Sequence, residues 1–130
     1  MHEFKVVAKA LIKRRNKILI LKRSKTGKNF PSHWDLPGGT LEENEQPENA
    51  LQREVFEETR LKTKPGKILT AFTLKHRGEL LFITYGVHAT NSDVKISAEH
   101  EQFKWATPAF IKKEKKAEPF LRDLVRKKII

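Results

Sequence analysis

The chain has 130 residues, a length that suits one folded domain with one hydrophobic core. It contains no cysteine, which excludes disulfides and thiolate metal sites. It also lacks a signal-peptide pattern and any apolar run of membrane-spanning length, so we expect a cytoplasmic protein without membrane contact. The formal net charge of +11 favours polyanionic ligands such as nucleotides. Nucleic-acid binding is a less favoured alternative, because a lysine-rich surface is often simply solvated.

The first third of the chain predicts a β-hairpin. Residues 4–12 and 18–21 are apolar and rich in β-branched side chains. The basic segment 13–17 between them suits an exposed turn. Further along, Trp34 lies beside Leu36, which favours packing in a core over stacking on a nucleobase.

The segment 38–61 has the most informative spacing in the sequence. A helix is predicted to open at Pro47, because proline suits the first helical position. On that helix Glu54, Glu57 and Glu58 lie within an arc of roughly 100°. Like charges at this spacing destabilise an isolated helix, and a bound cation would reverse the penalty. Clustered carboxylates select a hard ion, so the pattern predicts a Mg²⁺ site, with Mn²⁺ as the alternative.

Two neighbouring features favour this metal site over a solvated acidic surface. Arg53 lies within the acidic run and can hold a carboxylate by a bidentate bond that fixes its direction. Gly38 and Gly39 precede the helix, and glycine lets the backbone approach a ligand closely. Leu51 and Val55 are four residues apart and should pack against a sheet beside the acidic face.

This segment resembles the signature of the Nudix hydrolases, Mg²⁺-dependent enzymes that hydrolyse nucleoside diphosphates linked to another moiety. The matching positions are Gly39, Glu45, Arg53, Glu54, Val55, Glu57, Glu58 and Leu61. Arg60 departs from the pattern, because the family usually has glycine there, at a helix end where a left-handed conformation is common. An arginine in that conformation costs on the order of 1 kcal/mol. We expect the change to affect the following loop and not the chemistry.

The middle of the chain predicts a second pair of strands. Residues 68–74 and 80–89 are the strand segments, and residues 76–79 are a hairpin turn between them. Pro65 and Gly66 predict a turn ahead of the first of these strands.

The C-terminal part predicts two helices. Thr107 and Pro108 form a helix start with a capping residue, and residues 119–128 have apolar side chains at helical spacing. Strands before and after one long helix predict an α/β fold, a mixed β-sheet flanked by helices. The resemblance implies a Nudix-type α/β/α sandwich over a single domain, residues 1–130.

The resemblance also implies roles for individual residues. The metal ligands would be Glu54, Glu57 and Glu58 together with a backbone carbonyl at the glycine turn, assigned to Gly39. Arg23 would contact a substrate phosphate, and an acidic loop residue before a strand ending in tryptophan would reach the metal site. Glu99 is our match for that residue, as a ligand or as the base, and Glu101 is the substitute.

A diphosphate linkage resists attack because its negative oxygens repel a nucleophile. Divalent ions held by Glu54, Glu57 and Glu58 would neutralise that charge and activate the attacking water. The proton would pass to Glu54, Glu57 or Glu99, and the sequence does not choose among them. His100 is a weaker candidate for the base.

The first hypothesis is therefore a Mg²⁺-dependent pyrophosphohydrolase of nucleoside triphosphates or other nucleoside diphosphate derivatives. The alternatives are hydrolysis of ADP-ribose or dinucleoside polyphosphates, and a non-catalytic module that binds nucleotide or RNA. Residues 117–119 lack the asparagine with which mutator-type relatives read an oxidised purine, so specificity for 8-oxo-guanine nucleotides is not expected. Monomer and homodimer both stay open.

Overall fold

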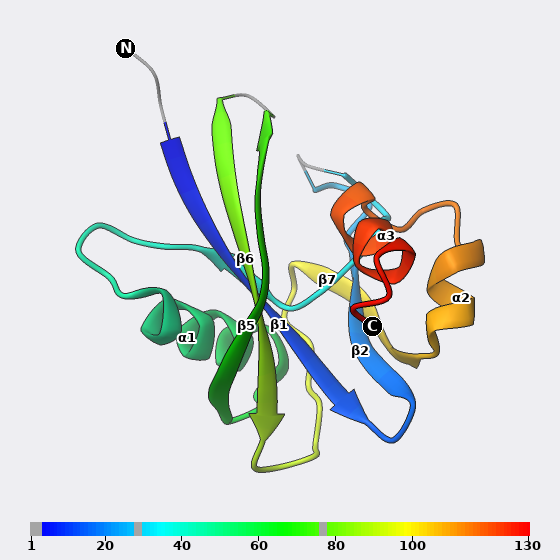
Figure 1. Ribbon diagram of the computed structural model, residues 1–130. Coiled ribbons are helices and arrows are strands. Elements are labelled where there is room, and N and C mark those ends of the chain that lie inside the picture. The colour runs from blue at the N-terminus through cyan, green and yellow to red at the C-terminus, as the bar shows by residue number, and fades with distance from the viewer. Residues whose placement is uncertain (1–3, 28–29, 76–77) are drawn as a thin grey trace.

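One mixed β-sheet runs through the molecule and carries helices on both sides (Figure 1). The computed structural model describes residues 4–27, 30–75 and 78–130. The strand order is β3-β2-β1-β6-β5, with β4 paired to β1 and β7 to β2. Strands β1 and β6 pair in parallel, whereas β5 and β6 are antiparallel. The elements are β1 (Phe4–Arg14), β2 (Lys17–Arg23), β3 (Trp34–Asp35), β4 (Gly38–Thr40), α1 (Pro47–Thr59), β5 (Thr63–Lys75), β6 (Glu79–Ala89), β7 (His100–Ala106), α2 (Pro108–Lys113) and α3 (Pro119–Arg126).

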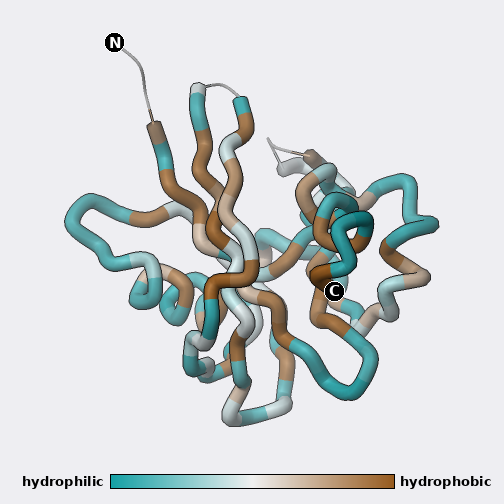
Figure 2. The backbone as a smooth tube through the Cα atoms, viewed as in Figure 1, coloured by the Kyte–Doolittle hydropathy of each residue, from teal (hydrophilic) through white to brown (hydrophobic). Residues whose placement is uncertain are grey.

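Strand β1 separates two hydrophobic cores, because successive side chains of a strand point to opposite faces. Val7 belongs to the core that contains Phe120 of α3, and Ala8 belongs to the core that contains Leu51 and Val55 of α1. Both α1 residues are fully buried, as predicted, and burying each is worth about 1.5–3 kcal/mol. Figure 2 shows hydrophobic stretches along the strands and hydrophilic ones in the connecting turns. The prediction of a sheet flanked by helices is confirmed.

The predicted N-terminal hairpin is present, and its strands diverge beyond the turn (Figure 1). Lys13 pairs with Ile18 and Arg14 with Lys17. Further along, β1 pairs with β4 and β6, while β2 pairs with β3 and β7. The segment 34–40 therefore crosses from β2 to β1, because β3 pairs with β2 and β4 pairs with β1. This crossing carries the glycine turn to the N-terminal half of β1.

Helix α1 begins at Pro47, as predicted, and ends in a left-handed residue. That residue is Arg60, with φ 64° and ψ 12°, and its N–H donates to the Phe56 carbonyl at 2.8 Å. The guanidinium lies over the Phe56 ring, 5.2 Å from its centroid. Asn91 supports the turn by donating to the Arg60 carbonyl at 3.1 Å. The arginine thus adopts the glycine-type conformation, and these contacts offset part of its cost.

Other details of the sequence-based prediction need correction. Pro65 and Gly66 form no turn, because β5 runs through them, and the pairing of β5 with β6 shifts register between Pro65 and Ile68. Proline lacks an N–H to donate, and an edge strand with a bulge accommodates it. The turn predicted at 76–79 includes residues 76 and 77, which lie outside the described residues.

The two C-terminal helices are present. Thr107 caps α2, its Oγ1 accepting from the Phe110 N–H at 3.2 Å. Helix α3 ends at Arg126, two residues before the predicted end. Within the described ranges, no helix has the length and apolar character needed to cross a membrane.

Candidate active site

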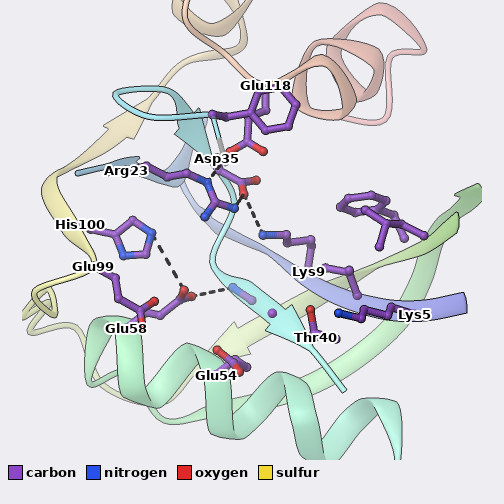
Figure 3. Close-up of a pocket in the computed structure, with 16 residues that line it drawn as sticks. Lys5, Lys9, Arg23, Asp35, Thr40, Glu54, Glu58, Glu99, His100 and Glu118 are labelled. Atoms are coloured by element: carbon purple, nitrogen blue, oxygen red, sulfur yellow. Dashed lines mark hydrogen bonds and ion pairs between the residues drawn. The ribbon is translucent and has the colours of Figure 1, made fainter. Parts of the chain in front are cut away.

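A cavity of about 500 Å³ opens between β1, β2, β4, helix α1 and the loop before β7 (Figure 3). Carboxylates from α1 and from the loop form one wall, and cationic side chains from β1 and β2 contribute to the other. The acidic wall consists of Glu54, Glu58 and Glu99, and the cationic residues are Lys5, Lys9 and Arg23.

The register of α1 decides which of its carboxylates reach the cavity. Glu54 and Glu58 are four residues apart on one face and both line it. Glu58 is buried, with 7% of its surface exposed, and the Glu54 side chain is 19% exposed. Glu57 does not line the cavity; its side chain is 57% exposed, with its carboxylate 3.5 Å from Arg53 Nη1.

The glycine turn lets these carboxylates lie against the backbone. A Cβ placed on Gly39 would lie 2.5 Å from Cδ of Glu54, closer than two carbons can approach. Gly38 has φ 138° and its N–H donates to Glu58 Oε1 at 2.8 Å. A Cβ there would collide with the carbonyl oxygen of Ala8. Only glycine at both positions keeps this arrangement of turn and carboxylates.

Arg53 fixes the direction of the acidic wall. Its Nε and Nη2 donate to the two oxygens of Glu45 at 2.8 and 3.0 Å, which is a bidentate pair. Nη1 donates to Glu54 Oε1 at 2.9 Å. The hydrogen bonds from Arg53 to Glu45 lower the pKa of Glu45 to about 2. Glu45 is therefore a loop anchor for Arg53, and Arg53 in turn orients Glu54.

Burial makes Glu54 and Glu58 costly to ionise. It raises the pKa of Glu58 to about 8 and also raises the pKa of Glu54. A divalent cation among these oxygens would favour the ionised forms and offset the loss of solvation. Glu58, Glu99 and His100 each offer one ligand atom, and these atoms all lie within 4.8 Å of one another. The donor set present thus fits a divalent cation.

His100 is the least satisfied polar group of the site. Its side chain is 5% exposed, and its Nε2 lies 4.0 Å from Glu58 Oε2. Its Nδ1 is buried without a partner among the described residues. Burial lowers the pKa of His100 to about 4, so the imidazole is neutral near pH 7 and the approach to Glu58 is not an ion pair.

The cationic residues Lys9 and Arg23 belong to a buried network that the sequence analysis missed. Lys9 Nζ and Arg23 Nη2 both contact Asp35 Oδ2, at 2.8 and 3.0 Å. Arg23 Nε donates to Glu118 Oε2 at 3.0 Å. Burial alone would raise the pKa of Asp35, but the charges of Lys9 and Arg23 outweigh it and lower the pKa. Burial raises the pKa of Glu118 to about 9.

One sequence signal for this network exists. Lys5 and Lys9 interrupt an apolar strand at positions of the same face, and both line the cavity.

Among the loop candidates, Glu99 lines the cavity, whereas Glu101 is an exposed residue of β7 outside the lining.

The fold and the site together define the class of protein: a mixed-sheet α/β protein with a carboxylate-lined cavity suited to a divalent cation. The NUDIX domain model matches residues 3–127. The chain therefore belongs to the Nudix hydrolase family, and the resemblance noted in the sequence is confirmed.

The chain is similar to several known proteins. It is 33% identical over 97 residues to mouse diphosphoinositol polyphosphate phosphohydrolase 3-alpha, covering 70% of this chain and 57% of that protein. It is 28% identical over 102 residues to a MutT-like protein of Streptomyces ambofaciens, covering 78% of this chain and 62% of the relative. The chain thus spans about three fifths of the length of these relatives.

Solved structures agree with the fold. The MutT protein from Methanosarcina mazei superposes with a TM-score of 0.89 at 26% identity, covering 97% of this chain and 93% of that one. A C. elegans Ap4A hydrolase superposes with a TM-score of 0.79 at 22% identity, covering 96% and 95%, and shows the fold alone. The predicted Nudix-type sandwich is confirmed.

Proposed function

We propose that the chain is a Mg²⁺-dependent pyrophosphohydrolase. It cleaves the diphosphate linkage of nucleoside triphosphates or other nucleoside diphosphate derivatives by attack of water at phosphorus. The observation that supports this most directly is one cavity that joins an acidic wall to cationic residues. A polyphosphate needs both, because its oxygens bind cations and its charge requires neutralisation before a nucleophile approaches. Residues 1–130 are proposed to act as one Nudix domain.

The acidic wall would hold the cation. The Gly38 N–H engages Oε1 of Glu58 and leaves Oε2 available, which supports Glu58 as a ligand. Glu57 and the Gly39 carbonyl are kept as ligands on the family resemblance. Bound there, a divalent cation would neutralise phosphate charge and activate the attacking water.

Glu54 and Glu99 both line the cavity, which supports either of them as the acceptor of the proton of that water. We assign this role to Glu54. Its orientation is fixed by Arg53 Nη1 at 2.9 Å, and burial raises its pKa, which makes it a stronger base than an exposed carboxylate. With Glu54 as the base, Glu99 is a metal ligand. The competing assignments of the base are Glu57 and Glu99.

The cationic residues would bind the phosphates. Asp35 contacts both Lys9 Nζ and Arg23 Nη2, and the charges of these two cations lower its pKa. Arg23 is held rigidly between Asp35 and Glu118, which supports its proposed contact with a substrate phosphate.

A release assay on a panel of phosphate compounds tests this function. The panel contains nucleoside triphosphates, ADP-ribose, a dinucleoside polyphosphate and a diphosphoinositol polyphosphate, each with Mg²⁺ and with EDTA. We expect Mg²⁺-dependent turnover that is strongest on nucleoside triphosphates. Absence of turnover on every compound, with tight nucleotide or RNA binding, would instead indicate a binding module.

Variants of single carboxylates test the assigned roles in the same assay. Glu54→Gln should lower turnover by about 10²–10⁴-fold, the usual contribution of a general base. Glu57→Gln should abolish nearly all turnover with the fold intact, and Glu99→Gln should weaken the metal dependence. Glu101→Gln is the matched control, because Glu101 is exposed outside the cavity. Full activity of Glu54→Gln would contradict its assignment as the base.

A further inference from the structure

We propose that His100 is a metal ligand, so that Glu58, Glu99 and His100 form a cation position with one nitrogen donor at the side of the cavity. This inference deepens the proposed function and rests on it. Its consequence is a site that gains affinity for Mn²⁺ and later divalent metals over Mg²⁺, because imidazole suits those ions and carboxylate oxygens suit Mg²⁺.

The separation of His100 and Glu58 is the first observation. Nε2 lies 4.0 Å from Glu58 Oε2, which exceeds the 2.7–3.2 Å range of a hydrogen bond. Two donors on opposite sides of one ion lie roughly 4.2 Å apart when each bond is ~2.1 Å. All three ligand atoms lie within 4.8 Å of one another, so shifts of less than about 1 Å bring them around one ion.

The unsatisfied imidazole is the second observation, independent of the acidic residues. His100 is more than nine-tenths buried, and neither ring nitrogen hydrogen-bonds to a described residue. A buried polar group left without a partner costs about 1–3 kcal/mol. A cation bonded to Nε2 supplies a partner for the ring nitrogen that faces Glu58.

The backbone holds all three donors in position before any ion arrives. His100 pairs with Arg23 in the β2–β7 ladder, and its N–H donates to the Ser97 carbonyl at 3.1 Å. The Glu99 carbonyl accepts from the Ser24 N–H at 3.1 Å. Glu58 uses Oε1 for the Gly38 N–H, so the oxygen that faces His100 is the other one.

Electron spin-echo spectroscopy of bound Mn²⁺ tests the nitrogen donor directly, without turnover. Mn²⁺ is added to the nucleotide-free protein, and ¹⁴N modulation of its signal is measured for wild type, His100→Gln and His88→Gln. His88 is an exposed histidine of β6 and provides the matched control. Equilibrium dialysis with Mn²⁺ and with Mg²⁺ gives the affinities of the same three proteins.

We expect ¹⁴N modulation in wild type and His88→Gln and none in His100→Gln. The affinity of His100→Gln for Mn²⁺ should fall roughly ten-fold or more, while its affinity for Mg²⁺ stays nearly unchanged. Bound Mn²⁺ without ¹⁴N modulation in wild type overturns the role of His100 and leaves the proposed hydrolase standing, whether or not the variant folds. Failure of wild type to bind either ion overturns both.

Discussion

Replacing Glu58 with glutamine should stabilise the cation-free protein, and the gain should grow with pH. Burial raises the pKa of Glu58 from 4.5 to about 8. Between these values the folded protein keeps a proton that the unfolded chain releases, so wild-type stability falls as pH rises. The loss is at most ~1.4 kcal/mol per pH unit, and the interval of 3.5 units sets an upper limit of ~5 kcal/mol. Glutamine carries no proton to lose and can still accept from the Gly38 N–H.

Urea unfolding in EDTA at about pH 5.5, 6.5 and 7.5 measures this effect. The free energy of unfolding of Glu58→Gln, minus that of wild type, should increase at each step. Glu101→Gln is the matched control, because Glu101 is exposed outside the cavity and its replacement removes no buried carboxylate. Adding Mg²⁺ should raise the free energy of unfolding of wild type more than that of Glu58→Gln, because only the glutamate carboxylate binds the ion. A difference for Glu58→Gln that does not change with pH would refute the reasoning from burial.

Three further substitutions test other parts of the structure. Gly39→Ala brings a methyl group against the Glu54 carboxylate and should lower turnover by about 10²-fold or more, with the circular dichroism spectrum unchanged. A fully active variant would show that turnover does not depend on the position of the Glu54 carboxylate beside Gly39. Arg60→Gly relieves a left-handed arginine and should raise the free energy of unfolding by up to ~1 kcal/mol without changing turnover. A loss of stability would instead mean that the contact of Arg60 with Phe56 outweighs the backbone cost. Arg23→Lys cannot bridge two carboxylates as the guanidinium does and should raise KM more than it lowers kcat; unchanged steady-state kinetics would remove Arg23 from the substrate contact.

Local patterns predicted the elements of the fold well, because strand and helix periodicity are set by nearby residues. Proline at the first helical position marked the start of α1 at Pro47, and a run of apolar and β-branched residues marked β1. The same local rules misjudged Pro65 and Gly66, which are turn residues in isolation. There the pairing of β5 with β6 holds the chain extended and a register shift absorbs the proline, a tertiary effect that the local sequence does not contain.

The candidate site was predicted only in part for a related reason. Helical spacing grouped Glu54, Glu57 and Glu58, but the packing of α1 on the sheet decides that Glu57 is exposed and Glu58 buried. The buried network depends on contacts between residues far apart in the chain. Lys9 contacts Asp35 across 26 positions and Arg23 contacts Glu118 across 95, and such pairings leave no mark in local spacing. His100 appeared in the sequence only as a weak base candidate, because its burial beside Glu58 is a property of the assembled fold.

A crystal structure with Mg²⁺ and a nonhydrolysable nucleoside triphosphate analogue tests the central claim most directly. We expect at least one ion with carboxylate oxygens of Glu57, Glu58 or Glu99 at about 2.0–2.1 Å, bridging to phosphate oxygens in the cavity. Phosphates bound elsewhere on the protein, with these carboxylates free of metal, would contradict the proposed function.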